Sequence, residues 1–161
     1  MQLRNVVTIN RSPAQVFAFL THFENLPLWN YAITETRRVG SGLVGLGARY
    51  SQTRTIPRPA TESFEVIEFD PDRSVAIRGT LGAFEALSRY QLRGSADATV
   101  LTSTMHLESS GLLRLADSLA MPRIRAAVAD NLQQLKAQLE AGPATRPRPP
   151  GQAGGHRPVR P

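Results

Sequence analysis

One alternating segment, residues 48–56, carries the polar side chains best suited to bind or polarise a ligand. Tyr50, Gln52 and Arg54 recur at every second position after Ala48, so a strand would place them on one face. The alanine and the tyrosine ring predict that this face points inward. An inward guanidinium group must be paired or solvated. We therefore expect Arg54 to bind an anionic or carbonyl-bearing ligand, to pair with an acid such as Glu65, or to reach water near the end of its strand.

Two later alternating segments add candidates to the same interior. One face of residues 84–92 carries Phe84, Ala86, Ser88, Tyr90 and Leu92. One face of residues 99–107 carries Leu101, Ser103, Met105 and Leu107, with His106 on the other face. Tyrosines on such faces usually pack and bind a local polar partner, and a catalytic phenol is the alternative for Tyr50 and Tyr90. Trp29, the single tryptophan, suits core or pocket-rim packing better than stacking on a ligand.

Other common chemistries find no support in the sequence. The absence of cysteine excludes disulfides, thiolate metal sites and a cysteine nucleophile. His22, His106 and His156 are far apart, and neither H-x-x-E-H nor H-E-x-x-H occurs, so neither a metal site nor a Ser-His-Asp triad is expected. The glycines at 40, 42, 45 and 47 do not introduce a helix, which argues against a phosphate-binding or dinucleotide loop. We expect neither a metal nor a cofactor.

The elements that must position these residues are mainly short strands. Alternation and turn residues predict strands at 2–10, 32–39, 48–56, 62–69, 74–79, 84–92 and 99–107, and their short connections predict an antiparallel meander. Ser12 and Pro13 predict a capped helix over 13–20, followed by a second short helix over 23–29. The apolar spacing after Gly111 predicts a helix over 112–120 and a longer one over 122–140, with a kink or a division at Pro122.

Charge and composition divide the chain into one domain, 1–141, and a tail, 142–161. The tail holds four arginines, many prolines and almost no apolar side chains, so we expect it to be disordered. The domain then has 15 basic and 13 acidic residues, which argues against a nucleic-acid partner despite the overall charge of +6. The apolar runs are too short to span a bilayer and no signal-peptide pattern begins the chain, so a cytoplasmic location is expected.

Several motifs in order resemble those of a known superfamily. The opening pattern is a strand, a capped helix at S-P-A-Q-V-F-A-F-L (12–20), a break at N-L-P (25–27) and then Trp29. It is followed by G-L-G-A-R-Y (45–50), E-F-D-P (68–71) and N-L-Q-Q-L-K-A-Q-L-E (131–140), while the usual turn before the last strand is degraded to S-A-D-A-T (95–99). Over about residues 6–140 the chain resembles the START-like (SRPBCC, helix-grip) superfamily, in particular its polyketide cyclase/dehydrase and lipid transport subset.

This resemblance implies an α+β helix-grip fold, in which a curved antiparallel sheet of about seven strands wraps around a long C-terminal helix and encloses a ligand cavity. Mainly apolar walls suit a hydrophobic small molecule such as a lipid, isoprenoid, sterol or polyketide. The expected ligand-binding residues are Trp29, Tyr50, Gln52, Arg54, Phe84, Ser88, Tyr90, Ser103, Met105, Leu115 and Leu119.

A binding or carrier protein, monomeric or weakly dimeric, is the leading interpretation. The alternative is an aromatase/cyclase or dehydratase in which Arg54 stabilises an enolate and Tyr50 or Tyr90 is the general acid. A coenzyme-Q-binding or ribosome-associated module is a third interpretation. The near-neutral domain argues against the ribosomal role, and the basic tail leaves weak contact with anionic partners open.

Overall fold

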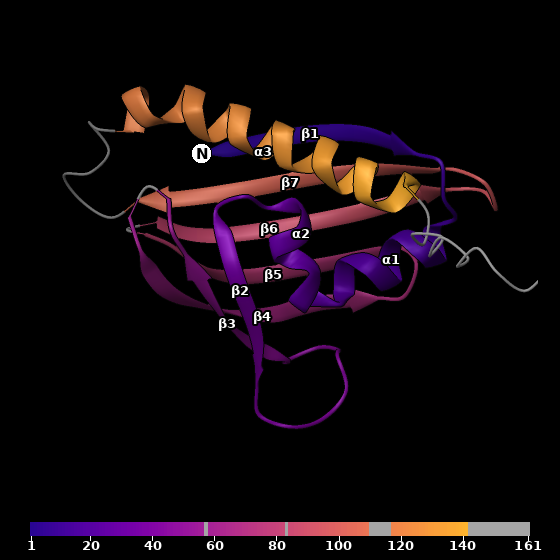
Figure 1. The fold of residues 1–161 in the computed structure, drawn as a ribbon, viewed down its shortest axis with the longest axis horizontal. Coiled ribbons are helices and arrows are strands. Elements are labelled where there is room, and N and C mark those ends of the chain that lie inside the picture. The colour runs from indigo at the N-terminus through magenta and orange to yellow at the C-terminus, as the bar shows by residue number, and fades with distance from the viewer. Residues whose placement is uncertain (57, 83, 110–116, 142–161) are drawn as a thin grey trace, which may run out of the picture.

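The protein folds into a single curved antiparallel sheet with its helices on one face. The computed structural model describes residues 1–56, 58–82, 84–109 and 117–141. The strands are β1 (Gln2–Ile9), β2 (Ile33–Val39), β3 (Arg49–Arg54), β4 (Ala60–Asp70), β5 (Ser74–Leu81), β6 (Phe84–Gly94) and β7 (Thr99–Ser109). Their order in the sheet is β1-β7-β6-β5-β4-β3-β2, so every neighbouring pair except β1 and β7 is consecutive in the chain (Figure 1). The predicted strands are confirmed, each with ends within two residues of the expected ones.

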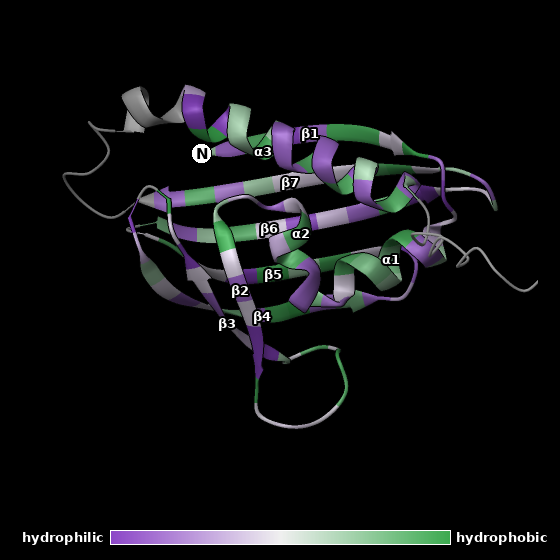
Figure 2. Ribbon diagram, in the orientation of Figure 1, coloured by the Kyte–Doolittle hydropathy of each residue, from purple (hydrophilic) through white to green (hydrophobic). Residues whose placement is uncertain are grey.

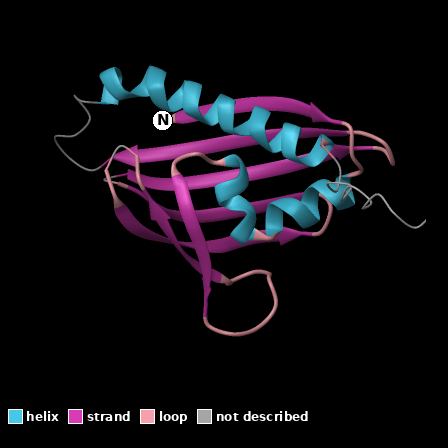
Figure 3. Cartoon of the chain, viewed as in Figure 1, coloured by secondary structure: helices cyan, strands magenta, loops and turns pink. Residues whose placement is uncertain are grey.

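The helices follow the first and the last strand. They are α1 (Pro13–Thr21), the 3₁₀ turn η1 (Phe23–Asn25), α2 (Leu26–Trp29) and α3 (Asp117–Glu140). In Figure 3 all of them lie in front of the sheet, with α3 toward β1 and β7 and with α1 and α2 over the middle strands. The helix-grip fold predicted from the sequence is thus confirmed, whereas the tail at 142–161 and residues 110–116 lie outside the described residues.

The start of α1 is fixed by its own sequence. The Ser12 side chain accepts a hydrogen bond from the Gln15 backbone N–H, and the Gln15 side chain accepts one from the Ser12 N–H, which forms a capping box. Pro13 occupies the first turn, where a missing N–H costs nothing. The helix then buries Phe17, whose ring meets Phe69 of β4 edge to face at 5.2 Å. The first helix therefore packs directly on the sheet.

The predicted division of the C-terminal helix at Pro122 is wrong for the residues described. α3 runs without a break from Asp117 to Glu140, with Pro122 inside it. Pro122 is the sixth residue, so the hydrogen bond it removes is one of the first in the helix, and the exposed ring lies away from the core.

The core lies between the sheet and the helices. The second half of α3 contributes Leu132, Leu135 and Leu139, all buried, and packs against β1 and α2. In Figure 2 hydrophobic colour is prominent along α1, while hydrophobic and hydrophilic residues alternate along α3 and the strands. Two contacts tie the end of α3 to β1 near this core: Lys136 Nζ donates to the Thr8 carbonyl at 2.6 Å, and the Asn10 N–H donates to Glu140 Oε1 at 2.8 Å.

Candidate ligand-binding site

Strand register sets side chains in rows across the inner face of the sheet. One row runs Asn5, Ser103, Tyr90 and Val75 over four adjacent strands. The next row, toward α3's first residues, runs Leu3, Met105, Ser88 and Ile77. Facing residues in such a row have Cβ atoms about 4.5–5.5 Å apart. Alternation in the sequence therefore placed Ser88, Tyr90, Ser103 and Met105 on the correct face, and Asn5 joins them as a polar residue that the sequence did not single out.

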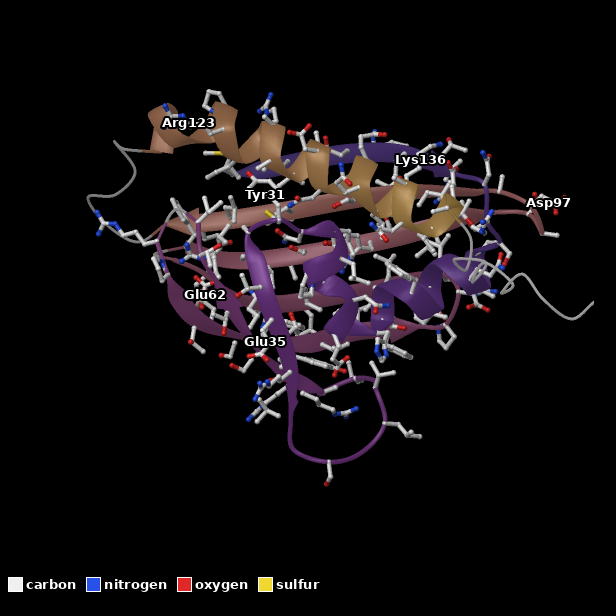
Figure 4. All side chains as sticks on the ribbon, in the orientation of Figure 1. Tyr31, Glu35, Glu62, Asp97, Arg123 and Lys136 are labelled. Atoms are coloured by element: carbon white, nitrogen blue, oxygen red, sulfur yellow. The ribbon has the colours of Figure 1, made fainter. Side chains whose placement is uncertain are left out.

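The inner face is covered unevenly along α3. Beneath its second half the leucines are fully enclosed, but Ile124, Ala127 and Val128 on its first half are only half-buried. On the sheet, Tyr90 and Met105 are likewise half-buried although they point inward. Figure 4 places Arg123, near the start of α3, and Glu62 at the same end of the molecule, with Asp97 at the other end. The side chains between the sheet and the first half of α3 are therefore more exposed than those beneath its second half.

Tyr90 packs beside Trp29 on the inner side of the sheet. The two rings meet edge to face with centroids 6.4 Å apart. Burial raises the pKa of Tyr90 to about 12. The hydroxyl is therefore protonated at neutral pH and can donate a hydrogen bond, but a group with this pKa transfers protons poorly near pH 7.

An amide on α3 is buried without a matching partner. Asn131 lies one helical turn after Ala127 and Val128 and one turn before Leu135, so it belongs to the inward stripe of α3. It is buried, and its Oδ1 atom has no hydrogen-bond partner among the described residues. A buried unpaired acceptor is costly, on the order of 1–3 kcal/mol. The same holds for the Oγ1 atom of Thr36, on the inner face of β2.

Arg54 points inward, as predicted, but its guanidinium group is already bonded. Its Nε and Nη2 atoms donate to Oε1 of Glu62 at 3.1 and 2.8 Å, and the two side chains are each only 5% exposed. Its Nη1 atom donates to the carbonyls of Ile56 and Arg58 at 2.9 and 3.1 Å, and the Gly82 N–H donates to the same Glu62 oxygen at 2.6 Å. The ion pair thus joins the β3–β4 and β5–β6 connections.

The acid that pairs with Arg54 differs from the one expected. Glu65 lies on the outer face, where it pairs with Arg49 at 3.1 Å and both side chains are well exposed. Glu62 shares the inner face with Phe64 and lies opposite Gln52, whose amide nitrogen is 3.5 Å from Glu62 Oε2. Glu62 is two residues from the inward Phe64, whereas Glu65 is one residue from it. Alternation along β4 therefore places the two acids on opposite faces of the sheet.

Tyr50 is enclosed by an aromatic cluster. Its ring stacks on Phe64 with 5.2 Å between the ring centroids, and it tilts against Phe23 with 4.8 Å between the centroids. The guanidinium carbon of Arg38 lies 5.9 Å from the centroid of the Tyr50 ring. Burial raises the pKa of Tyr50, the Glu24 carboxylate raises it further, and Arg38 opposes the shift. Tyr50 therefore packs as a core residue, and its hydroxyl is protonated at neutral pH.

The remaining candidates lie at the edges of this arrangement. Phe84 and Gln52 are half-buried on the inner face. Leu115 lies outside the described residues, and Leu119 lies in α3, where only the backbone is described. A separate surface cleft of about 430 Å³ opens between α2 and α3, lined by Pro27, Leu28, Tyr31, Asp130, Gln133 and Gln134.

Sequence reasoning missed Asn131, Thr36 and Asn5. Asn5 alternates with Leu3 and Val7, and this pattern could have placed it on the inner face. Among the residues described, no group of three histidine or acidic side chains could hold a metal ion. No described helix is long and apolar enough to cross a membrane.

The sheet wrapped on a C-terminal helix, with a mainly apolar inner face, defines a START-like helix-grip protein. The chain belongs to the polyketide cyclase/dehydrase and lipid transport family, whose model matches residues 1–140. This family comprises hydrophobic-ligand-binding and polyketide cyclase-type proteins. No curated protein sequence matches the chain.

Solved structures share the fold at low sequence identity. The Zhui aromatase/cyclase from Streptomyces sp. R1128 is 13% identical, with a TM-score of 0.72 over 87% of this chain and 93% of that one. The protein TTHA0849 from Thermus thermophilus is 16% identical, with a TM-score of 0.69 over 88% and 98%. A START superfamily protein from Mycobacterium smegmatis is 15% identical, with a TM-score of 0.66 over 87% and 94%. At these identities the likeness concerns the fold.

Proposed function

We propose that the protein binds an uncharged, largely apolar small molecule bearing a hydroxyl group, between the middle of α3 (residues 124–131) and the inner face of the sheet, without transforming it. The observation that carries this proposal is the buried, unpaired Oδ1 atom of Asn131 on the inward stripe of α3. A ligand hydroxyl that donates to this acceptor would remove the cost of leaving it unpaired. The row of Asn5, Ser103 and Tyr90 offers further polar contacts along an otherwise apolar wall.

The charges of the inner face favour a neutral ligand. Of the inward side chains described, Arg54 has its guanidinium bound to Glu62 and two carbonyls, and Arg38 lies over Tyr50 and donates to the Leu43 carbonyl. Apart from the Nε atom of Arg38, which has no hydrogen-bond partner among the described residues, a carboxylate would have to compete with these bonds to be neutralised. An unpaired buried charge is much more costly than an unpaired hydroxyl. A fatty acid should therefore bind less well than the corresponding alcohol.

The same contacts argue for binding without catalysis. In the cyclase alternative, Arg54 would stabilise an enolate and a tyrosine would supply a proton. The donors of Arg54 are directed at Glu62, Ile56 and Arg58, and the pKa of Tyr90, about 12, is far from the value that a general acid needs at neutral pH. A carrier needs neither group to be free.

The test is competition for a neutral fluorescent probe, N-phenyl-1-naphthylamine. Hexadecanol should displace the probe at lower concentration than hexadecanoate. Asn131→Leu, which keeps the side-chain size, should weaken hexadecanol about three- to tenfold, the value of one neutral hydrogen bond, and leave hexadecane unchanged. Gln138→Leu, an exposed amide on the same helix, is the matched control and should change neither.

Two results would contradict the proposal. One is tighter binding of hexadecanoate than of hexadecanol, and the other is an Asn131→Leu variant with unaltered affinity for the alcohol. Native mass spectrometry of protein purified from its own host gives the independent check, because a retained ligand would reveal its mass. Cyclisation of a short polyketide mimic by the wild-type protein would favour the enzyme instead.

A further inference from the structure

The connection between β2 and β3, residues 40–48, holds apolar side chains out into solvent. Leu43 is 92% exposed and Leu46 is 74% exposed, and Val44 between them is also exposed. In Figure 1 this connection extends away from the body on the side opposite α3, and in Figure 2 much of it has the hydrophobic colour. Single exposed leucines are ordinary, but three apolar side chains at the tip of one projecting loop form a distinct surface. We call residues 43–46 the apolar tip.

The apolar tip has a defined shape. A guanidinium nitrogen of Arg38 donates to the Leu43 carbonyl, and the Ala48 N–H donates to the Gly45 carbonyl at 3.1 Å. At the base, the Gly47 N–H donates to the Val66 carbonyl at 2.7 Å, in a backbone conformation (φ +79°) that favours glycine. The loop is therefore tied to both β2 and β4 while its leucines point outward.

Basic side chains surround the base of the apolar tip. Residues 36–50 contain Arg37, Arg38 and Arg49 and no acidic residue. The side chains of Arg37 and Arg49 are 75% and 70% exposed, and each pairs with an exposed acid, Glu35 or Glu65. Exposed pairs of this kind contribute little and exchange partners easily, so anionic headgroups can compete for both arginines.

We propose that the apolar tip inserts into the surface of an anionic lipid bilayer, with Arg37 and Arg49 at headgroup level. An apolar side chain above basic residues is the arrangement by which peripheral proteins bind membranes. A stable protein interface needs about 800 Å² from each partner with complementary shape, which a narrow convex tip does not offer. A bilayer accepts a convex apolar tip without a matching shape, and the exposed Arg37 and Arg49 beside the tip favour an anionic surface. This inference does not depend on the proposed ligand.

The experiment is vesicle flotation of the full chain with two lipid compositions, phosphatidylcholine alone and phosphatidylcholine mixed with phosphatidylglycerol. The wild type should bind the anionic vesicles more strongly. The double variant Leu43→Ser, Leu46→Ser should lower the partition into these vesicles by about a hundredfold, because each of the two leucines that leaves water contributes about a factor of ten. The matched control is Val6→Ser with Val100→Ser, which removes two exposed apolar side chains from β1 and β7.

The outcomes distinguish insertion of the apolar tip from attraction by the tail and from general surface hydrophobicity. Because the arginine-rich tail is present in every variant, attraction by the tail alone would leave the leucine variant at wild-type binding, which would overturn the proposal. Equal losses of vesicle binding in the leucine variant and the valine control would overturn the proposal as well. So would a wild-type protein that binds neither kind of vesicle, a result that would point to a protein partner for the apolar tip instead. Thermal melting checks that each variant is folded. The leucine variant should also bind N-phenyl-1-naphthylamine like the wild type, which separates failure of this inference from failure of the proposed ligand site.

Discussion

Replacing Arg54 by methionine should strongly destabilise the fold. The substitution removes the two hydrogen bonds to Glu62 and the two to the carbonyls of Ile56 and Arg58, in a site where the paired side chains are 5% exposed. Glu62 would remain buried, and among the described residues it would keep as donors the Gly82 N–H at 2.6 Å and the Gln52 amide at 3.5 Å. Removing one partner of a buried ion pair typically costs about 3–5 kcal/mol, because the other charge is left uncompensated.

The sheet supplies a matched control for this substitution. Arg49 begins the same strand and pairs with Glu65, but there the side chains are 70% and 42% exposed. Arg49→Met should therefore cost no more than about 1 kcal/mol. The double variant Arg54→Met, Glu62→Leu should be more stable than Arg54→Met alone, because it removes the unpaired carboxylate along with the cation.

Urea unfolding followed by the fluorescence of Trp29, the single tryptophan, measures all of these variants. Trp29 is buried beside Tyr90, so its emission should change when the interior opens. A cost below about 1 kcal/mol for Arg54→Met, equal to that of Arg49→Met, would refute the reasoning. It would mean that the guanidinium reaches solvent and that the buried pair is not present in solution.

Two further predictions concern the core and the interior phenol. Leu132→Ala should lower the free energy of unfolding by about 2–5 kcal/mol because Leu132 is buried, whereas Gln133→Ala, one position away and exposed, should change it by no more than about 0.5 kcal/mol in urea unfolding. The pKa of Tyr90 is raised from 10 to about 12 in the folded state. Between pH 10 and pH 12 its hydroxyl is therefore protonated in the folded protein and deprotonated in the unfolded chain. Its contribution to stability is complete below pH 10 and decreases as the pH rises toward 12, so Tyr90→Phe should show a shallower alkaline loss of melting temperature; identical slopes would contradict the assigned pKa.

The strands and their faces could be predicted from the sequence because alternation is a local property. Ser88 and Tyr90 lie inward, as their spacing from Leu92 indicates. The partner of Arg54 depends on which strand lies alongside and at what register, and the length of the β3–β4 turn does not reveal this. Even so, the apolar frame of Phe64 and Val66 favours Glu62 over Glu65, so this signal was present in β4.

The part of the site on α3 could not be derived in the same way. Asn131 is a polar residue in a helix whose exposed face is also polar, and its burial follows from how α2 and the sheet enclose it. The helix also continues through Pro122, because tertiary packing of its later leucines outweighs one missing hydrogen bond. The class of site was expected from the family resemblance and stays a prediction, whereas the polar contacts of the inner face depend on tertiary structure.

The pairing of β1 with β7 has a consequence for how the chain folds during synthesis. The first strand leaves the ribosome long before β7, its neighbour in the sheet, which begins at Thr99, and before α3, which packs against it. Until then β1 presents an unpaired edge together with Leu3, Val7 and Ile9, which have no interior to enter. Closure of the sheet therefore joins the first and last elements of the domain in one late step, and a nascent chain stalled before α3 would depend on chaperones to avoid aggregation.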